Sequence, residues 1–304
     1  MKIAFLFLLI DNPNFPELWD KYFNDNADKY SIYIHPKYPD KHTWRPQNII
    51  SNIQETGWGF ITKAYLELFK EAYKNKENVK FITLSEGCLP IKTFDIFYRD
   101  CINDIDRSWI KTMQISPYDK NSRLLKHIWQ VKHGDHKNKH IKIPNYNTIF
   151  KHYARTCLMR KDVKKLLIAK SEGKMKFFDT MHVGDEFFLT VIGPLNKNKY
   201  VNFEVTYDDW DYTKNEVKKI DKLMIKAYRL YENKNTSKKE KEKHLIQICE
   251  LKSLKKIIAS HPKTIVNVEE DIDNINRVDS YFYRKFAKNS NIDDYWNSII
   301  DNKN

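Results

Sequence analysis

The sequence predicts an α/β protein in which a mixed, mainly parallel sheet is flanked by helices and a helical hairpin is inserted late in the chain. Strand-like and helix-like segments alternate from the N-terminus, which is typical of parallel strands joined by crossover helices. An amphipathic helical pattern begins near residue 215, and a second helix-like segment follows a short polar turn. The 304 residues are enough for one large domain with a buried core.

Apolar runs and their period predict the elements of the first two thirds of the chain. The expected strands are Lys2–Ile10, Tyr30–His35 and Val79–Leu84. The expected helices are Asn12–Asn24, Phe60–Tyr73 and Met159–Lys170. The stretch 116–147 is rich in His and Lys without a clear period, so we expect an irregular loop region there.

The expected hairpin consists of the helices Asn215–Tyr231 and Lys238–Ile258, with a turn at 233–237. It carries much of the basic charge, because residues 214–256 contain 14 Lys or Arg against 6 Asp or Glu, a net of +8 out of +13 for the whole chain. We therefore expect a core at 1–211, an inserted basic hairpin at 212–258 and a C-terminal segment at 259–304.

The composition, with 41% hydrophobic residues, is that of a globular protein and not of a disordered one. The apolar run Ile3–Ile10 is far shorter than the roughly 20 residues that span a bilayer. No cleavage-site pattern follows it, so we expect a soluble or cytoplasmic protein without signal peptide or membrane anchor. The four cysteines are widely spaced and are expected to be reduced thiols.

The most specific motif spans residues 57–98 and reads GWGFITKAYLELFKEAYKNKENVKFITLSEGCLPIKTFDIFY. The other motifs, in chain order, are FLFLLIDNPNFPELWDKYF, YSIYIHPK, GDEFFLTVI, VTYDDWD, SHPKTI and YFYRKF. Together they resemble the core-2/I-branching glycosyltransferases, a family that includes peptide xylosyltransferases and many plant relatives. The resemblance covers residues 3–210 and 261–286, and the hairpin at 212–258 has no counterpart in it.

The resemblance implies a GT-A fold, in which a nucleotide-binding half is merged with an acceptor-binding half. It implies inverting transfer of a sugar, N-acetylglucosamine in preference to xylose, from a UDP-sugar donor to a glycan hydroxyl. It also implies that no metal or other cofactor is needed. In agreement, no Asp-x-Asp follows a strand in the first hundred residues, and the spacing of the histidines in the 116–147 stretch fits a solvated loop better than a zinc site. These histidines are His127, His133, His136 and His140.

Inverting transfer needs a base that takes the acceptor proton and positive charge that stabilises the leaving diphosphate. By resemblance the base is Glu186, in the sequence Gly184-Asp185-Glu186. A carboxylate that precedes an apolar stretch can lie at a pocket rim, where partial burial tunes its pKa. The alternative is an acidic residue that complements the N-terminal dipole of a helix.

By resemblance the diphosphate is bound by Lys285 in the closing motif and by Lys263 after the His-Pro element, where the family has Arg. Lysine keeps the charge but lacks the bidentate geometry of a guanidinium, and Arg284 is the neighbour that can compensate for this. The alternative for each lysine is a solvated surface charge.

Ligands of open α/β sheets bind beyond the carboxyl ends of the strands, which places the expected nucleotide site there. The nucleotide-side candidates are Ile34, His35, Trp58, Ser85 and Glu86. The alternative for His35 is a histidine packed in the core or a loop, and the alternative for Trp58 is a core tryptophan. Acceptor recognition typically pairs aromatic rings with hydroxyl-binding polar groups. The acceptor-side candidates are Tyr207, Asp209, Trp210 and Arg123, with Asp208 next to them in the sequence.

The rival hypothesis is a protein that binds nucleic acid or a membrane surface through the basic hairpin. The hairpin lysines are interleaved with acids and no aromatic series accompanies them, so we favour the enzyme, with no nucleic-acid partner and with peripheral membrane contact left open. A third interpretation makes the hairpin an oligomerisation element. The expected partners of the enzyme are a nucleotide-sugar donor and a glycan or glycoconjugate acceptor.

Overall fold

The computed structural model describes residues 1–113, 123–134, 141–196, 198–233, 235–259 and 262–292. Its centre is a six-stranded sheet with the strand order β2-β1-β3-β8-β5-β9. The strands are β1 (Lys2–Leu9), β2 (Tyr30–Pro36), β3 (Asn78–Ser85), β5 (Ser108–Trp109), β8 (Cys157–Met159) and β9 (Tyr200–Val201). Only β8 runs antiparallel to its neighbours, which confirms the mixed, mainly parallel sheet.

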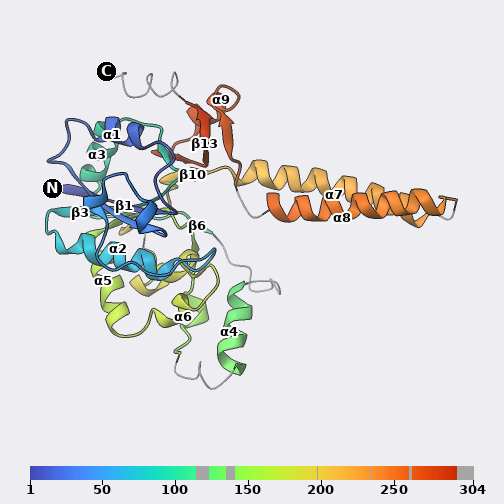
Figure 1. Cartoon of the computed structure of the whole chain (residues 1–304). Coiled ribbons are helices and arrows are strands. Elements are labelled where there is room, and N and C mark those ends of the chain that lie inside the picture. Colours follow the sequence, from blue (N-terminus) through green and yellow to red (C-terminus); the bar gives the residue numbers. More distant parts are fainter. Residues whose placement is uncertain (114–122, 135–140, 197, 234, 260–261, 293–304) are drawn as a thin grey trace.

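Strand β1 is apolar throughout because both faces of the sheet are covered. Its side chains alternate between two core clusters: Ala4 and Leu6 pack with helices α2 and α5, and Phe5 and Phe7 with α1 and α3. The helices are α1 (Pro16–Phe23), α2 (Thr62–Lys74), α3 (Phe94–Asn103) and α5 (Arg160–Ser171). Figure 1 shows α1 and α3 on one side of the sheet and α2 and α5 on the other.

A second, small sheet joins three distant parts of the chain. Strand β12 (Phe282–Arg284) pairs in parallel with β10 (Thr206–Asp208) and antiparallel with β4 (Leu89–Pro90). Strand β11 (Ile265–Asn267) pairs with β13 (Phe286–Asn291), and β6 (Thr112–Met113) pairs with β7 (Lys151–His152). The C-terminal strands thereby return to the segment that follows β3.

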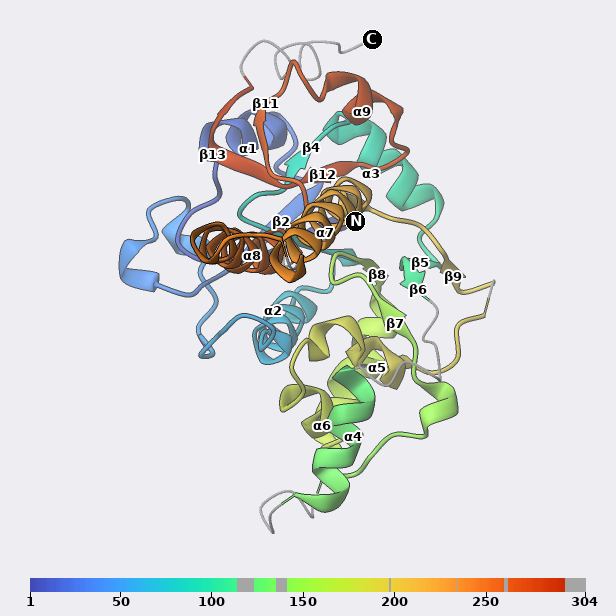
Figure 2. The ribbon, with the colours of Figure 1, turned by 90° about the vertical axis from the view of Figure 1, so that its right-hand side faces the viewer.

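The expected hairpin is present as α7 (Trp210–Glu232) and α8 (Lys238–Ile258), which pack on each other and extend away from the body (Figures 1 and 2). Asp209 caps the start of α7, and Ser237 forms a capping box with Glu240 at the start of α8. Within the described ranges, no helix is both long and apolar enough to cross a membrane.

The expectation of an irregular loop at 116–147 is wrong for its central part, because helix α4 (Arg123–His133) lies there. Leu124 and Val131, seven residues apart, are buried on one face, as in an amphipathic helix. His127 is also buried, and its Nε2 lies 3.0 Å from the Phe177 carbonyl oxygen, so it is not a solvated loop histidine. His136 and His140 lie outside the described residues.

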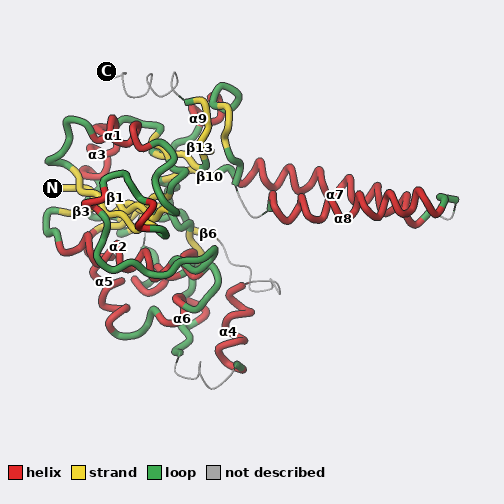
Figure 3. Tube along the Cα trace, viewed as in Figure 1, coloured by secondary structure: helices red, strands yellow, loops and turns green. Residues whose placement is uncertain are grey.

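The remaining helices are short, as the tube view of the secondary structure makes visible (Figure 3). They are α6 (Lys176–Asp179), α9 (Ile272–Arg277) and the 3₁₀ turns η1 (Pro39–Lys41), η2 (Pro46–Asn48), η4 (Tyr146–Thr148), η5 (Gly184–Glu186) and η6 (Phe188–Ile192). The expected helix Met159–Lys170 is confirmed as α5. The four cysteines are free, as expected, and only Cys249 among them is exposed.

Candidate active site

The small sheet brings three polar side chains together beyond the end of β3. The register of β10 and β12 sets Asp208 opposite Arg284. Arg284 Nη1 donates a hydrogen bond to Asp208 Oδ1 over 3.0 Å, and Arg284 Nε lies 3.2 Å from Ser85 Oγ. All three side chains are largely buried, so this charged network is fixed in place.

Arg155, which the sequence analysis did not single out, adds a second guanidinium to this network. Its Nη1 lies 4.0 Å from Asp208 Oδ2, and its buried Nε has no hydrogen-bond partner within the described part of the chain. Although burial opposes its charge, the nearby Asp208 carboxylate raises the pKa of Arg155 above its ordinary value. Arg155 therefore stays charged in a site that holds two arginines and one carboxylate between them.

Lys285 follows Arg284 directly and is half-buried. Burial lowers the pKa of its ammonium, and the neighbouring Arg284 lowers it further. Its chain passes close to Gly87, where an added Cβ would lie 2.9 Å from Lys285 Cγ. Among the described residues, no ion pair or hydrogen bond engages the Lys285 ammonium. Its positive charge is therefore not neutralised by a paired carboxylate.

Lys263 is placed differently from the expectation that grouped it with Lys285. Its ammonium pairs with Asp271 and lies 4.7 Å from the centre of the Tyr212 ring. A lysine that is already neutralised by a buried carboxylate has less charge to offer a diphosphate, so Lys263 is the weakest of the basic candidates. The preceding Ser260 and His261 of the same motif lie outside the described residues.

Glu186 ends the 3₁₀ turn η5 instead of starting an α-helix. Its carboxylate is 30% exposed and its Oε2 lies 2.8 Å from Lys151 Nζ, on the strand β7. Val183, just before the turn, has a left-handed backbone with φ of 58°, which is costly for a β-branched residue. Its N–H donates to the Gly59 carbonyl oxygen, so the loop after β2 holds the turn that carries Glu186.

Gly184 is required by space at this turn. A Cβ at Gly184 would lie 2.0 Å from the Phe178 carbonyl oxygen and 3.1 Å from Thr62 Oγ1. We expect Gly184→Ala to destabilise the protein by about 1–3 kcal/mol or more, because backbone atoms must move to admit the methyl group. Gly57→Ala is the matched control, since a Cβ at Gly57 meets nothing within 4 Å.

Denaturant unfolding of the two glycine variants measures this difference in the free energy of unfolding. Equal unfolding midpoints for Gly184→Ala and Gly57→Ala would contradict the close approach of Gly184 to Phe178.

Asp185 links the carboxylate side of the site to the basic side. Its side chain is buried, and burial together with the nearby Glu186 raises its pKa to about 6, although Arg155 opposes this. The same buried carboxyl contributes to the high pKa of Arg155. Glu186 and Arg155 thus both act electrostatically on Asp185, so the base candidate and the basic network are both within electrostatic reach of one buried group.

The raised pKa of Asp185 predicts a pH dependence of stability. The folded state holds this proton more tightly than the unfolded state, so the contribution of Asp185 is fully present below its ordinary pKa of 3.8 and is lost as pH rises through about 6. We expect Asp185→Asn to become more stable than the wild type as pH rises, by about 2–3 kcal/mol near neutrality. Urea unfolding at a series of pH values measures this; a constant difference between the two proteins would be the contrary result.

Trp58 lies on the Glu186 side of the site and contacts no nucleotide-side candidate. Its exposed ring is 4.9 Å from the His182 ring and 5.5 Å from the Arg123 guanidinium. Burial lowers the pKa of His182, and Arg123 and Glu186 act on it in opposite directions. Trp58, Arg123, His182 and Glu186 are therefore neighbours, which groups Trp58 with the acceptor candidates.

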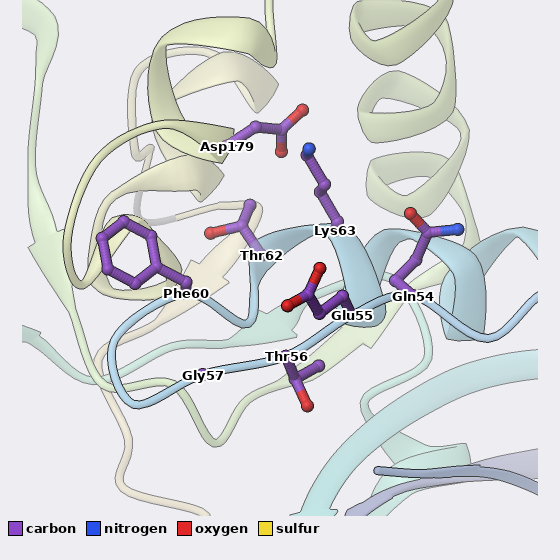
Figure 4. Close-up of a pocket in the computed structure, with 8 residues that line it drawn as sticks. All are labelled: Gln54, Glu55, Thr56, Gly57, Phe60, Thr62, Lys63 and Asp179. Atoms are coloured by element: carbon purple, nitrogen blue, oxygen red, sulfur yellow. The ribbon is translucent and has the colours of Figure 1, made fainter.

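A polar pocket of about 370 Å³ lies beside the η5 turn, where Gly184 closely approaches Thr62. Figure 4 shows Lys63 of α2 and Asp179 of α6 directed toward each other across it. Burial raises the pKa of Asp179, and its Oδ1 has no partner among the described residues. The pocket is lined by Gln54, Glu55, Thr56, Gly57, Phe60, Thr62, Lys63 and Asp179.

The nucleotide-side candidates on β2 differ from the expectation. The Ile34 side chain is buried in the core and its carbonyl oxygen accepts from Ile50 N, so Ile34 does not fit a ligand contact. His35 is also buried; its Nε2 accepts from Gln54 N at 2.9 Å, and burial lowers its pKa. His35 thus fixes the start of the pocket-lining loop. Ser85 and Glu86 lie at the end of β3, as expected.

The acceptor-side candidates near residue 208 make contacts with other parts of the fold. Asp209 Oδ1 accepts from Tyr212 N as the cap of α7, and the Tyr207 ring packs 5.2 Å from the Tyr283 ring. Asp208 pairs with the two arginines, and Trp210 is the half-buried first residue of α7. These contacts give the side chains structural roles, and their part in acceptor binding stays a prediction.

Sequence reasoning missed Arg155, Lys151 and His182. Arg155 and Lys151 lie just beyond the stretch 116–147. Nothing in the sequence links Arg155 to Asp208 or Lys151 to Glu186. His182 precedes the quoted motif by two residues and was detectable only by that proximity. Among the described residues, no group of three or more His, Cys, Asp or Glu is placed to hold a metal ion.

A mainly parallel sheet with charged side chains gathered beyond its strand ends defines an α/β enzyme that binds an anionic ligand. The family model described as Core-2/I-Branching enzyme matches residues 3–258, from β1 to the end of α8. The match therefore includes the α7–α8 hairpin, which the sequence resemblance left without a counterpart, and it ends before Lys263, Arg284 and Lys285. The chain belongs to the Core-2/I-Branching enzyme family and is therefore a glycosyltransferase of GT-A-like fold, which acts on a nucleotide-sugar donor and a glycan acceptor. No curated protein sequence shows a significant match to it.

Proposed function

We propose that this glycosyltransferase inverts the anomeric centre and moves N-acetylglucosamine, or else xylose, from a UDP-sugar to a glycan hydroxyl without a metal. The observation that carries the proposal is that the partly exposed Glu186 carboxylate and Arg155, a member of the network with Arg284 and Asp208, both act electrostatically on the buried Asp185. In this proposal Glu186 accepts a proton and the arginine network stabilises an anion. Both are within the electrostatic reach of Asp185.

In the proposed reaction the acceptor oxygen attacks the anomeric carbon from the face opposite the diphosphate. A new carbon–oxygen bond forms as the bond to the phosphate oxygen breaks, and the bonding electrons leave with UDP. Glu186 takes the acceptor proton. Lys285 and Arg284 stabilise the negative charge that develops on the diphosphate, with Arg155 adding to the positive potential.

Lys151 and the pocket beside η5 complete the proposed roles. The Lys151 ammonium, 2.8 Å from Glu186 Oε2, orients the carboxylate before the acceptor arrives. The pocket is lined by amide, carboxylate and ammonium groups, which suit sugar hydroxyls. The neighbouring Trp58 ring provides an exposed apolar face of the kind that stacks on a pyranose.

A thermal-shift panel of nucleotide sugars tests the donor class. A ligand that binds the folded state alone raises the midpoint of unfolding, so we expect UDP-sugars, and UDP-N-acetylglucosamine most, to stabilise the protein. GDP- and CMP-sugars serve as controls. Stabilisation by one of these controls, with none by a UDP-sugar, would overturn the proposed donor.

Metal independence is tested by measuring transfer in excess EDTA. We expect activity to be retained, because the basic side chains supply the charge that a divalent cation supplies in other enzymes. Loss of activity that manganese restores would show that a metal takes part in the reaction.

A further inference from the structure

The α7–α8 hairpin exposes a row of leucines along its length. Leu223, Leu230 and Leu254, here called the leucine row, have 50%, 39% and 44% of their surface exposed. Other exposed apolar residues of the hairpin are Ile225, Leu245, Ile246 and Ile257. Single exposed leucines are normal on soluble proteins, but several along one projecting rod indicate a contact surface. Figures 1 and 2 show that the hairpin stands away from the body, which leaves this surface accessible.

The leucine row lies on one side of the seam between the helices. The opposite side is marked by two contacts, from Lys255 Nζ to Asp221 Oδ1 at 2.6 Å and from Lys252 Nζ to the Tyr228 ring at 5.5 Å. Each leucine follows Asp221, Tyr228 or Lys252 by two residues, which is about 200° of helical turn. The three leucines therefore share the face that points away from these polar contacts.

The charge of the hairpin selects an anionic partner. Residues 214–256 carry a net +8, which leaves +5 of the total +13 for the rest of the chain. Lys226 follows Leu223 by three residues and precedes Leu230 by four, so it lies beside the row and is exposed. Lys219 precedes Leu223 by four residues on the same face; its Nζ lies 2.6 Å from Glu216 Oε1, an exposed pair that contributes little and that a headgroup can replace. The partner must accept lysine ammonium groups and leucine side chains on one surface.

Of the possible anionic partners, a lipid surface meets both requirements. A second copy of the hairpin would bring two segments of net +8 together, which is unfavourable. A nucleic acid would satisfy the lysines but offers no apolar phase for leucines, and the rod presents no row of exposed aromatic rings for base stacking. Headgroups and acyl chains accept basic and apolar side chains at the same depth.

We propose that the α7–α8 hairpin docks the protein on an anionic membrane surface. The leucine row enters the boundary between headgroups and acyl chains, and Lys219 and Lys226 contact the anionic headgroups. The hairpin lies in the plane of the surface and does not cross the bilayer. This inference is independent of the donor, the acceptor and the catalytic residues proposed above.

Vesicle flotation of the full chain tests the docking. We expect binding to vesicles of phosphatidylcholine with phosphatidylglycerol, no binding to phosphatidylcholine alone, and weaker binding as salt rises. Replacing all three leucines of the row by Ser is expected to weaken binding by about tenfold or more. The matched control is Ile225→Ser with Leu245→Ser, because these exposed residues lie 180–200° round their helices from row members.

Circular dichroism checks that both sets of variants keep their helices, so that a loss of binding reports the surface and not the fold. Equal loss in the leucine-row and control variants, or equal binding to neutral and anionic vesicles, overturns the proposal. So does sedimentation that shows a dimer lost in the leucine-row variant, which would identify a second copy as the partner. Binding of a duplex oligonucleotide in place of vesicles would identify nucleic acid.

Discussion

Glu186→Gln is expected to lower the rate of sugar transfer by about 10²–10⁴-fold while donor affinity stays nearly unchanged. Glutamine keeps the size and the hydrogen-bonding reach of the side chain but cannot accept the proton of the acceptor hydroxyl. The diphosphate is expected to bind Arg284 and Lys285, and the substitution removes neither side chain, so it leaves that contact intact. Steady-state transfer and calorimetric titration with a UDP-sugar measure the two quantities separately.

A matched control for this variant is Glu172→Gln, which removes another partly exposed carboxylate paired with a lysine, Lys174. It lies at the C-terminal end of α5, and we expect it to keep wild-type transfer and stability. Full activity of Glu186→Gln would refute the proposed base. Loss of donor binding together with transfer would instead indicate that the charge of Glu186 holds the site together.

Some elements of the fold are visible as patterns in the amino-acid sequence, and others are not. Strands β1, β2 and β3 were predictable from short apolar or β-rich runs, and helix α7 from apolar side chains at steps of three and four. Helix α4 was predictable as well, because Leu124, Ile128 and Val131 lie at steps of four and three, a helical period within a stretch whose His and Lys content indicated a loop. The segment Gly184–Glu186 forms a 3₁₀ turn and not the start of an α-helix, and its close approach to Phe178 is a tertiary feature that the sequence does not show.

For the candidate site, sequence identified groups that belong to motifs and missed groups that depend on tertiary pairing. Glu186, Arg284 and Lys285 stand in recognisable motifs. Arg155 lies two residues before β8, and the pairing of β8 with β3 brings it to the site. Its contact with Asp208 joins residues that are 53 positions apart in the sequence. In the same way, the pairing of Lys263 with Asp271 is visible only once the chain around β11 is folded.

Lys285→Gln is expected to weaken binding of UDP or a UDP-sugar by about 10–100-fold, the usual worth of one charge-assisted hydrogen bond. Lys285 is half-buried, and among the described residues no carboxylate pairs with it, so its charge is available to a diphosphate. Lys288→Gln is the matched control, because Lys288 is an exposed lysine on β13, three residues further on. Isothermal titration compares the two variants.

The pH dependence of the same binding separates a direct contact from a general effect of charge. Burial and the neighbouring Arg284 lower the pKa of Lys285, so its ammonium loses its proton at a lower pH than an exposed lysine does. Donor affinity of the wild type is therefore expected to fall early as pH rises, and Lys285→Arg should remove this fall because a guanidinium stays charged. If Lys285→Arg and the wild type lose affinity over the same pH range, another group titrates, and Lys285 does not hold the diphosphate.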